Sequence, residues 1–178
     1  MNLGSLLTEH RLHINSSLEE SLINLFCSTK TIGSRKRLLE NWFEGYIYCA
    51  SLGLAHDRRR PFEKGEKSQK AQWSSSYISQ YEYLLCQVLA RQDVMAELGL
   101  WTVKKDVEDF DIISSIKERY TDDAEFDVHL FYKKVLQEAK NICDEYMNGG
   151  LEILQEKRNE GLIFTDELDT LVKLFKRQ

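Results

Sequence analysis

The residues of this 178-residue chain that could do chemistry are basic clusters rather than a catalytic set. Three consecutive arginines stand directly before the only proline, Pro61, and a second basic triplet follows Ser34. Guanidinium groups bind phosphate in a bidentate manner, so such clusters can hold phosphates or nucleic acid. The candidate contact residues are Arg11, His13, Arg35, Lys36, Arg37, Arg58, Arg59 and Arg60. A solvated surface with internal ion pairs is the competing interpretation for the cluster that begins at Arg58, because Asp57, Glu63 and Glu66 are interleaved with its basic residues.

Motifs for catalysis or metal binding are missing from the sequence. There is no phosphate-binding glycine loop, no HExxH helix and no GxSxG turn. His10 and His13 are three residues apart, but no third metal ligand is indicated. The acidic run at residues 106–111 lacks the alternation and the glycine of a calcium loop, which favours a solvated helix face. We therefore predict no cofactor, no metal site and no enzymatic activity.

Composition and charge favour a soluble cytoplasmic protein. Charged residues make up 30% of the chain, and no apolar run approaches the about 18 residues that a membrane span needs. Cys27, Cys49, Cys86 and Cys143 are far apart, which is typical of free thiols in a reducing compartment. Residues 1–91 carry 12 Lys and Arg against 9 Asp and Glu, whereas residues 92–178 carry 12 against 20. This asymmetry permits one end that faces a polyanion and one acidic end.

Hydrophobic periodicity predicts a mainly α fold. Between Ser34 and Gly53, apolar residues recur at three- and four-residue steps, which places them on one face of a helix. Ser34 is the expected N-cap, and Gly53 the expected left-handed end of this central helix. We predict a single compact multi-helix bundle over residues 1–178, with residues 1–10 as a flexible arm and residues 54–73 as a long basic loop.

The second half of the sequence predicts further helices. One runs from Tyr77 to about Arg91, and a short one ends near Gly99. The longest begins after Thr121 and ends near Met147, where Asn148, Gly149 and Gly150 are expected to break or kink it. A further helix over residues 151–161 and a last one after Thr165 complete the bundle.

A short strand is expected at the N-terminus. Polar and apolar residues alternate over RLHIN, residues 11–15, and a helix, a turn and a second helix follow. Ribbon-helix-helix DNA-binding units share this order, and two strands of a dimer then enter the major groove. Arg11 and His13 would be the outward residues of such a strand. The competing interpretation is an extended arm packed on the bundle.

Two stretches resemble a known family. One is EGYIYCASLGLAHDRRRPF, residues 44–62, and the other begins CDEYMNGGLEIL and extends over residues 143–175. The chain resembles the small accessory proteins encoded with Dnd-type (DNA phosphorothioation-dependent) bacterial defence and restriction systems. In that family, an LAAALGF-x-x-x-R-R-x-P segment is followed, after an insert, by EEYANGGLEIL. The residues of the likeness that we single out are Gly53, Arg58, Arg59, Pro61, Asn148, Gly149 and Gly150.

The resemblance implies a non-enzymatic subunit of an anti-phage complex. Its partners would be other subunits, such as a large ATPase or nuclease component, and it gives no catalytic residues. A DNA-binding module built on the N-terminal half and the basic loop is the alternative function. The sequence leaves open direct contact with DNA and the formation of a homodimer.

Overall fold

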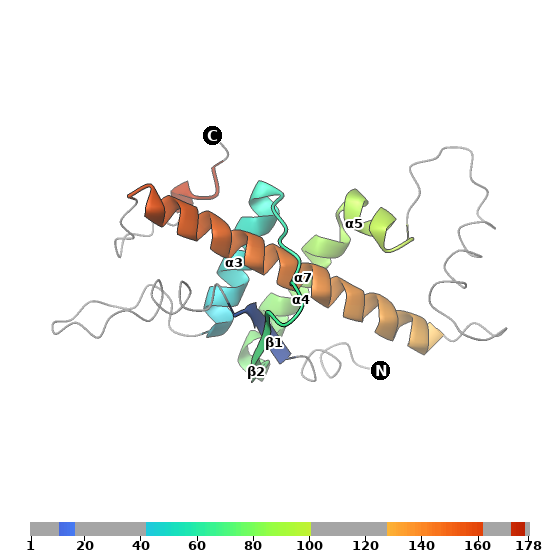
Figure 1. Cartoon of the computed structure of the whole chain (residues 1–178). Helices are drawn as coiled ribbons and strands as arrows, with labels where there is room; N and C mark the ends of the chain where they lie inside the picture. Colours follow the sequence, from blue (N-terminus) through green and yellow to red (C-terminus); the bar gives the residue numbers. More distant parts are fainter. Residues whose placement is uncertain (1–10, 17–41, 101–127, 162–171, 177–178) are drawn as a thin grey trace. The chain divides into compact units, whose positions relative to one another are not determined.

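The computed structural model describes residues 11–16, 42–100, 128–161 and 172–176, with only the backbone described for residues 67–72 and 128–129. These residues are mainly helical, as the periodicity predicts, and Figure 1 shows their elements. The chain divides into two compact units, Met1–Leu84 with Cys143–Gln178, and Leu85–Ile142. This division does not decide whether residues 1–178 form one domain, which stays a prediction.

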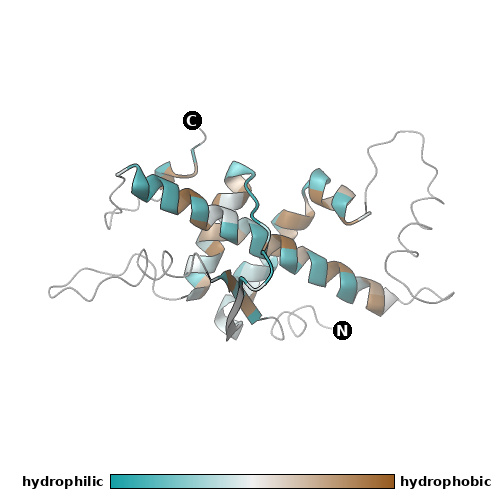
Figure 2. Ribbon diagram, viewed as in Figure 1, coloured by the Kyte–Doolittle hydropathy of each residue, from teal (hydrophilic) through white to brown (hydrophobic). Residues whose placement is uncertain are grey.

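Helix α7, Val128–Asn159, provides the centre of the first unit. From Cys143 to Leu154, every residue except Glu145 and Glu152 is buried. Figure 2 shows hydrophilic and hydrophobic residues along the whole helix. A helix covered on almost all sides must have its polar groups paired, because unpaired buried polar groups are costly. The central helix of this unit is therefore α7, and not the helix before Arg58 that the sequence favoured.

Helix α3, Trp42–His56, crosses α7 with the two backbones in direct contact. A Cβ atom on Gly53 would overlap the backbone carbonyl of Tyr146, and a Cβ on Gly150 would overlap that of Cys49. Each helix thus contributes a glycine that faces a carbonyl of the other. Only glycine permits such an approach, since any other residue brings a Cβ atom.

The predicted break at Asn148, Gly149 and Gly150 is wrong. Helix α7 continues through all three residues, and they are buried. A glycine destabilises a helix by about 1 kcal/mol relative to alanine, so a pair of glycines in the sequence predicts a break. Here the close packing against α3 outweighs that cost. Gly149 has a similar role, because a Cβ at this position would overlap the carbonyl of Arg58.

The predicted end of α3 at Gly53 is also wrong, because the helix continues for one more turn. Asp57 adopts the left-handed conformation, with φ of 54°. Its N–H donates to the carbonyl of Leu54 at 3.2 Å, and the N–H of Arg58 donates to that of Gly53 at 2.8 Å. This pair of bonds is a Schellman motif, with aspartate where glycine is usual.

The predicted N-terminal strand is confirmed, and it has a partner that the sequence did not indicate. Strand β1, Arg11–Asn15, pairs antiparallel with β2, Lys67–Gln72, and the register is irregular between Arg11 and His13. The segment 54–73 is therefore only partly a loop. Its first residues complete α3 and its last form β2, leaving residues 57–66, which we call the strap.

The second unit is built from shorter elements. Helix α4, Ile78–Leu89, follows the 3₁₀ turn η1, Ser75–Tyr77, and enters this unit with its last residues. Helix α5, Gln92–Glu97, comes next, and the unit ends with the first half of α7. Both α4 and α5 lie where the periodicity predicts helices. The predicted helix that follows RLHIN, the first part of the helix that begins at Ser34, and the acidic run at residues 106–111 lie outside the described residues.

The glycine crossing gives a direct stability prediction. Gly150→Ala should destabilise the protein by about 2–3 kcal/mol, because the new Cβ forces α3 and α7 apart. Helix propensity alone would change stability by about 1 kcal/mol in the opposite direction. Urea unfolding measures the difference, with Gln137→Ala, exposed on the same helix, as a control that should stay within about 0.5 kcal/mol. A Gly150→Ala protein as stable as the wild type would contradict the crossing.

Candidate interaction site

The strap lies directly on α7. The N–H of Arg60 donates to the carbonyl of Glu145 at 3.0 Å, and the side-chain amide of Asn148 donates to the carbonyl of Arg60 at 3.4 Å. The carbonyl of Arg58 lies against Gly149. These contacts join backbone to backbone as well as side chain to backbone. The three arginines of the strap are therefore held along one side of α7.

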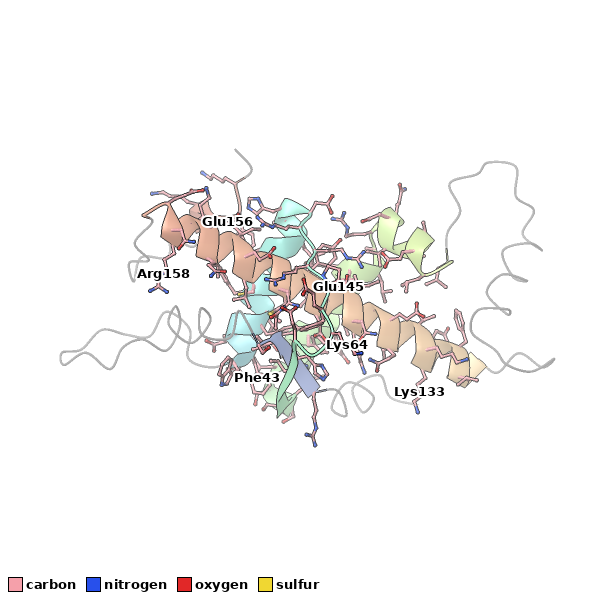
Figure 3. The ribbon with its side chains drawn as sticks, viewed as in Figure 1. Phe43, Lys64, Lys133, Glu145, Glu156 and Arg158 are labelled. Atoms are coloured by element: carbon pink, nitrogen blue, oxygen red, sulfur yellow. The ribbon has the colours of Figure 1, made fainter. Side chains whose placement is uncertain are left out.

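Each strap guanidinium meets carboxylates of α7. Arg58 donates two bonds of 2.6 Å to Glu156 and lies 3.3 Å from Glu152. Arg59 donates to Glu145 at 2.9 Å. Arg60 lies 3.1 Å from Glu152, and 3.5 Å from Glu66 within the strap itself. Figure 3 labels Glu145 and Glu156 on the ribbon of α7. The glutamates are spaced seven and four residues apart, which puts them on one face of the helix.

The charges of this ladder nearly cancel. Four carboxylates face three guanidiniums, so the patch has a net negative charge. The hydrogen bonds to Glu156 raise the pKa of Arg58, and the same bonds hold the pKa of Glu156 below its usual value. All three guanidiniums are between a quarter and about a third exposed. Since phosphate would have to compete with carboxylates already in place, the patch is a poor phosphate site.

A buried polar chain lies beneath the strap. The hydroxyl of Tyr46 on α3 donates to Asp144 Oδ1 of α7 at 2.6 Å. The other carboxylate oxygen, Oδ2, lies 3.4 Å from Nδ1 of His13 on β1. Burial, followed by the charge of Asp144, raises the pKa of Tyr46 well above its usual value, so its hydroxyl stays a proton donor. One buried carboxylate thus joins α3, β1 and α7.

Asn148 completes the junction between the strap and the sheet. Its side-chain oxygen accepts the N–H of Asn15 at 3.2 Å, while its amide group donates to Arg60 in the strap. Asn15 in turn donates from its side chain to Glu66 at 2.6 Å, and Glu66 accepts the N–H of Ser16 through its backbone. Both asparagines are fully buried. Asn148, which directly precedes the glycine pair, therefore determines where β1 ends.

Aromatic rings fill the space around this polar chain. Trp73 stacks on Tyr81 with ring centroids 4.1 Å apart, and Tyr46 meets Trp73 edge to face at 5.3 Å. Arg59 lies over the ring of Tyr146, 5.7 Å from its centroid. Such offset and edge contacts add to the stabilisation from apolar burial. The Asp144 carboxylate is fully buried, which strengthens its hydrogen bond from Tyr46.

The structure places the candidate contact residues in different surroundings. Arg11 is exposed on β1. His13, expected to point outward, is 17% exposed and faces the buried Asp144, because β1 is held against α7. Pro61 is exposed within the strap. Arg58, Arg59 and Arg60 are the paired arginines of the strap, and Arg35, Lys36 and Arg37 lie outside the described residues.

Sequence reasoning missed the acidic half of this site. Glu145, Glu152 and Glu156 are 86 or more positions from the arginines that they bind. Their seven- and four-residue spacing on a predicted helix was the available signal. The predicted break at the glycines hid it, because it divided these glutamates between two helices.

Comparisons with known proteins give no further identification. No protein-family model, curated protein or solved structure matches the chain. Among the described residues, no cluster of three or more His, Cys, Asp or Glu could hold a metal ion. The helices of the described ranges include none that is long and apolar enough to cross a membrane. What the geometry defines is a junction of α3, the strap, β1 and α7.

The buried bond between Tyr46 and Asp144 can be tested by removing one hydroxyl. Tyr46→Phe should destabilise the protein by about 1–3 kcal/mol, because the buried carboxylate loses a donor. Tyr132→Phe, at a ring that is 60% exposed, is the matched control and should have almost no effect. Thermal unfolding followed by circular dichroism compares the two. Equal stabilities for both variants would show that the bond does not contribute.

A double-mutant cycle measures the inner pair of the ladder. Arg59→Gln and Glu145→Gln, alone and together, should give a coupling of about 1–2 kcal/mol, since both groups are mostly shielded from water. The exposed pair of Lys157 and Glu160 should give at most about 0.5 kcal/mol. Urea unfolding of both sets provides the values. A coupling no larger at Arg59 than at Lys157 would contradict the seating of the strap.

Proposed function

We propose that this chain is a non-enzymatic accessory subunit of a bacterial anti-phage or restriction defence complex of the Dnd type. It acts through protein–protein contacts with other subunits, such as a large ATPase or nuclease component, in the cytoplasm. The proposal combines the family likeness of residues 44–62 and 143–175 with the geometry of the first unit.

The observation that carries the proposal is where the family-like residues lie. Gly53 and Gly150 form the backbone crossing, and Gly149 receives the strap. Arg58 and Arg59 bind α7, and Asn148 ties the strap to β1. Two stretches more than 80 residues apart thus meet in one junction. Residues that resemble the family and build this junction maintain a scaffold. A scaffold suits a subunit that binds partners better than one that catalyses a reaction.

The charge of the junction also favours a protein partner over DNA. DNA binding needs several free cationic groups, each of which releases counterions from a phosphate. The strap arginines are already matched by the glutamates of α7 and by Glu66. A surface with balanced charges suits a protein interface, where both signs are paired across the contact.

The alternative function is a DNA-binding module. The exposed position of Arg11 on β1 and the basic surplus of residues 1–91 favour it. In a ribbon-helix-helix unit, the strand pairs with its copy in a dimer. Here β1 pairs with β2 of the same chain, and Leu12 and Ile14 are fully buried. Any contact of β1 with DNA would therefore differ from the contact that the strands of ribbon-helix-helix proteins make.

Co-purification tests the leading proposal. The tagged chain is co-expressed with the proteins encoded beside it and purified at low and raised salt. We expect at least one neighbour to co-elute at a fixed ratio at both salt concentrations, and deletion of the gene to weaken phage restriction. A chain that always elutes alone, with neighbours that restrict phage equally well without it, would overturn the proposal.

Binding to a labelled DNA duplex, measured by fluorescence anisotropy against salt concentration, separates the alternative. The leading proposal expects little binding and a shallow salt dependence. A steep dependence that becomes shallower in Arg11→Ala, by about one unit of slope, would favour the DNA-binding module. Lys133→Ala, an exposed cation on α7 outside the N-terminal half and the basic loop, is the matched control.

A further inference from the structure

Residues 172–176, which we call the docked turn, pack against the second half of α3. The ring of Phe175 meets that of Tyr48 edge to face, with the two centroids 5.5 Å apart. Nε2 of His56, the last residue of α3, lies 2.5 Å from the carbonyl oxygen of Leu174. Because a carbonyl oxygen only accepts hydrogen bonds, the imidazole is the donor. The side chain of Leu174 is itself buried, so two adjacent apolar residues and one carbonyl anchor the docked turn.

The histidine at the end of α3 binds the docked turn as a helix end is bound. The N–H of Phe175 donates to the carbonyl of Val172 at 3.1 Å, and the N–H of Lys176 donates to that of Lys173 at 3.2 Å. The next carbonyl along the chain, that of Leu174, is the one that the imidazole binds. Carbonyls at the end of a helical turn have no partner within it, and histidine suits the negative end of the dipole. The histidine therefore recognises the backbone, and the two apolar residues add the side-chain contacts.

The docked turn is only partly buried. Val172 is 50% exposed, and Lys173 and Lys176 are exposed. A single helical turn does not form by itself in water, because nucleation fixes several residues for very few hydrogen bonds. The turn therefore gains its order from docking on α3, where the burial of Leu174 and Phe175 offsets the loss of conformational entropy. These two opposing contributions are of similar size for so short a segment, so the docking is reversible.

The second half of α3 suits an apolar ligand. No residue from position 45 to position 55 of this helix carries a charge. Burial, followed by the neighbouring Cys49, raises the pKa of Tyr48 above its usual value, so its hydroxyl stays neutral beside Phe175. A charged side chain placed there would lose its hydration without gaining a counter-charge from the helix. An aliphatic residue followed by an aromatic one, as in the docked turn, avoids that loss.

We propose that the second half of α3 is a peptide-binding site, which the docked turn fills reversibly until a partner replaces it. The partner is a short helical segment of another protein, with an aliphatic residue followed by an aromatic one and with lysines on its outer side. The docked turn is then a tethered competitor, and it lowers the apparent affinity for the partner in proportion to how often the site is filled. Every contact used here lies within the first unit, and none depends on the proposed defence function.

A labelled peptide tests the site in the full chain. The probe is a fluorescent peptide with the sequence of residues 170–178, and its binding is followed by anisotropy. Leu174→Ser together with Phe175→Ser removes both anchors of the docked turn and leaves α3 unchanged. This doubly substituted protein should bind the peptide at least about tenfold more tightly than the wild type, because a tethered segment competes at an effective concentration of about millimolar. A peptide with the same two substitutions is the control and should bind neither protein.

Substitutions in α3 locate the bound peptide. His56→Ala, added to the doubly substituted protein, should weaken peptide binding roughly fivefold, because the hydrogen bond to the peptide carbonyl is lost. Gln137→Ala, at an exposed position of α7, should leave the binding unchanged. Equal binding by the wild-type and the doubly substituted proteins, or no binding by either, would overturn the proposal. Binding that both His56→Ala and Tyr48→Ala leave unchanged would also overturn it.

Hydrogen exchange of the wild-type chain provides a second test that needs no variant. Reversible docking predicts that the amides of Phe175 and Lys176 exchange at least about a hundredfold faster than those of residues 143–154 in α7. Equal protection of the two sets would show that the docked turn opens only when the whole unit unfolds. The turn would then be a fixed part of the fold, and the proposal would be wrong.

Discussion

The close approach of two helix backbones is the constraint on which the first unit depends. Gly53 of α3 lies against a carbonyl of α7, and Gly150 of α7 lies against a carbonyl of α3. At this separation neither position can hold a side chain. The approach also brings the last turn of α3 onto α7, so the strap leaves α3 directly along the helix that it must follow. Both glycines therefore determine where the arginines of the strap lie.

The same crossing determines how the buried polar groups of the unit are paired. A helix buried almost all round has no water for Asp144 or Asn148, and each must find partners on the elements packed against it. Asp144 meets Tyr46 of α3 and His13 of β1, and Asn148 meets β1 and the strap. The two-stranded sheet and the strap are thus held by side chains of α7. A buried polar network of this kind favours one arrangement of the elements over others.

The sequence predicted which segments form helices better than it predicted what the glycines and the basic residues in them do. Apolar periodicity identified α3, α4, α5 and most of α7, because amphipathic helices carry that signal locally. It could not distinguish a glycine that ends a helix from one that admits a second backbone, since both uses depend on the missing Cβ. Strand β2 escaped notice because KSQKAQ has no apolar alternation. The basic triplet was identified, but its partners lie on another helix, and only the fold brings them together.

Native-state hydrogen exchange of the backbone amides tests the central crossing most directly. A continuous α7 held against α3 predicts that the amides on both sides of Gly149 and Gly150 exchange slowly and as one cooperative block. Fast exchange confined to the residues around Gly149 and Gly150, between two independently protected segments, would show that the helix breaks there and would contradict the account.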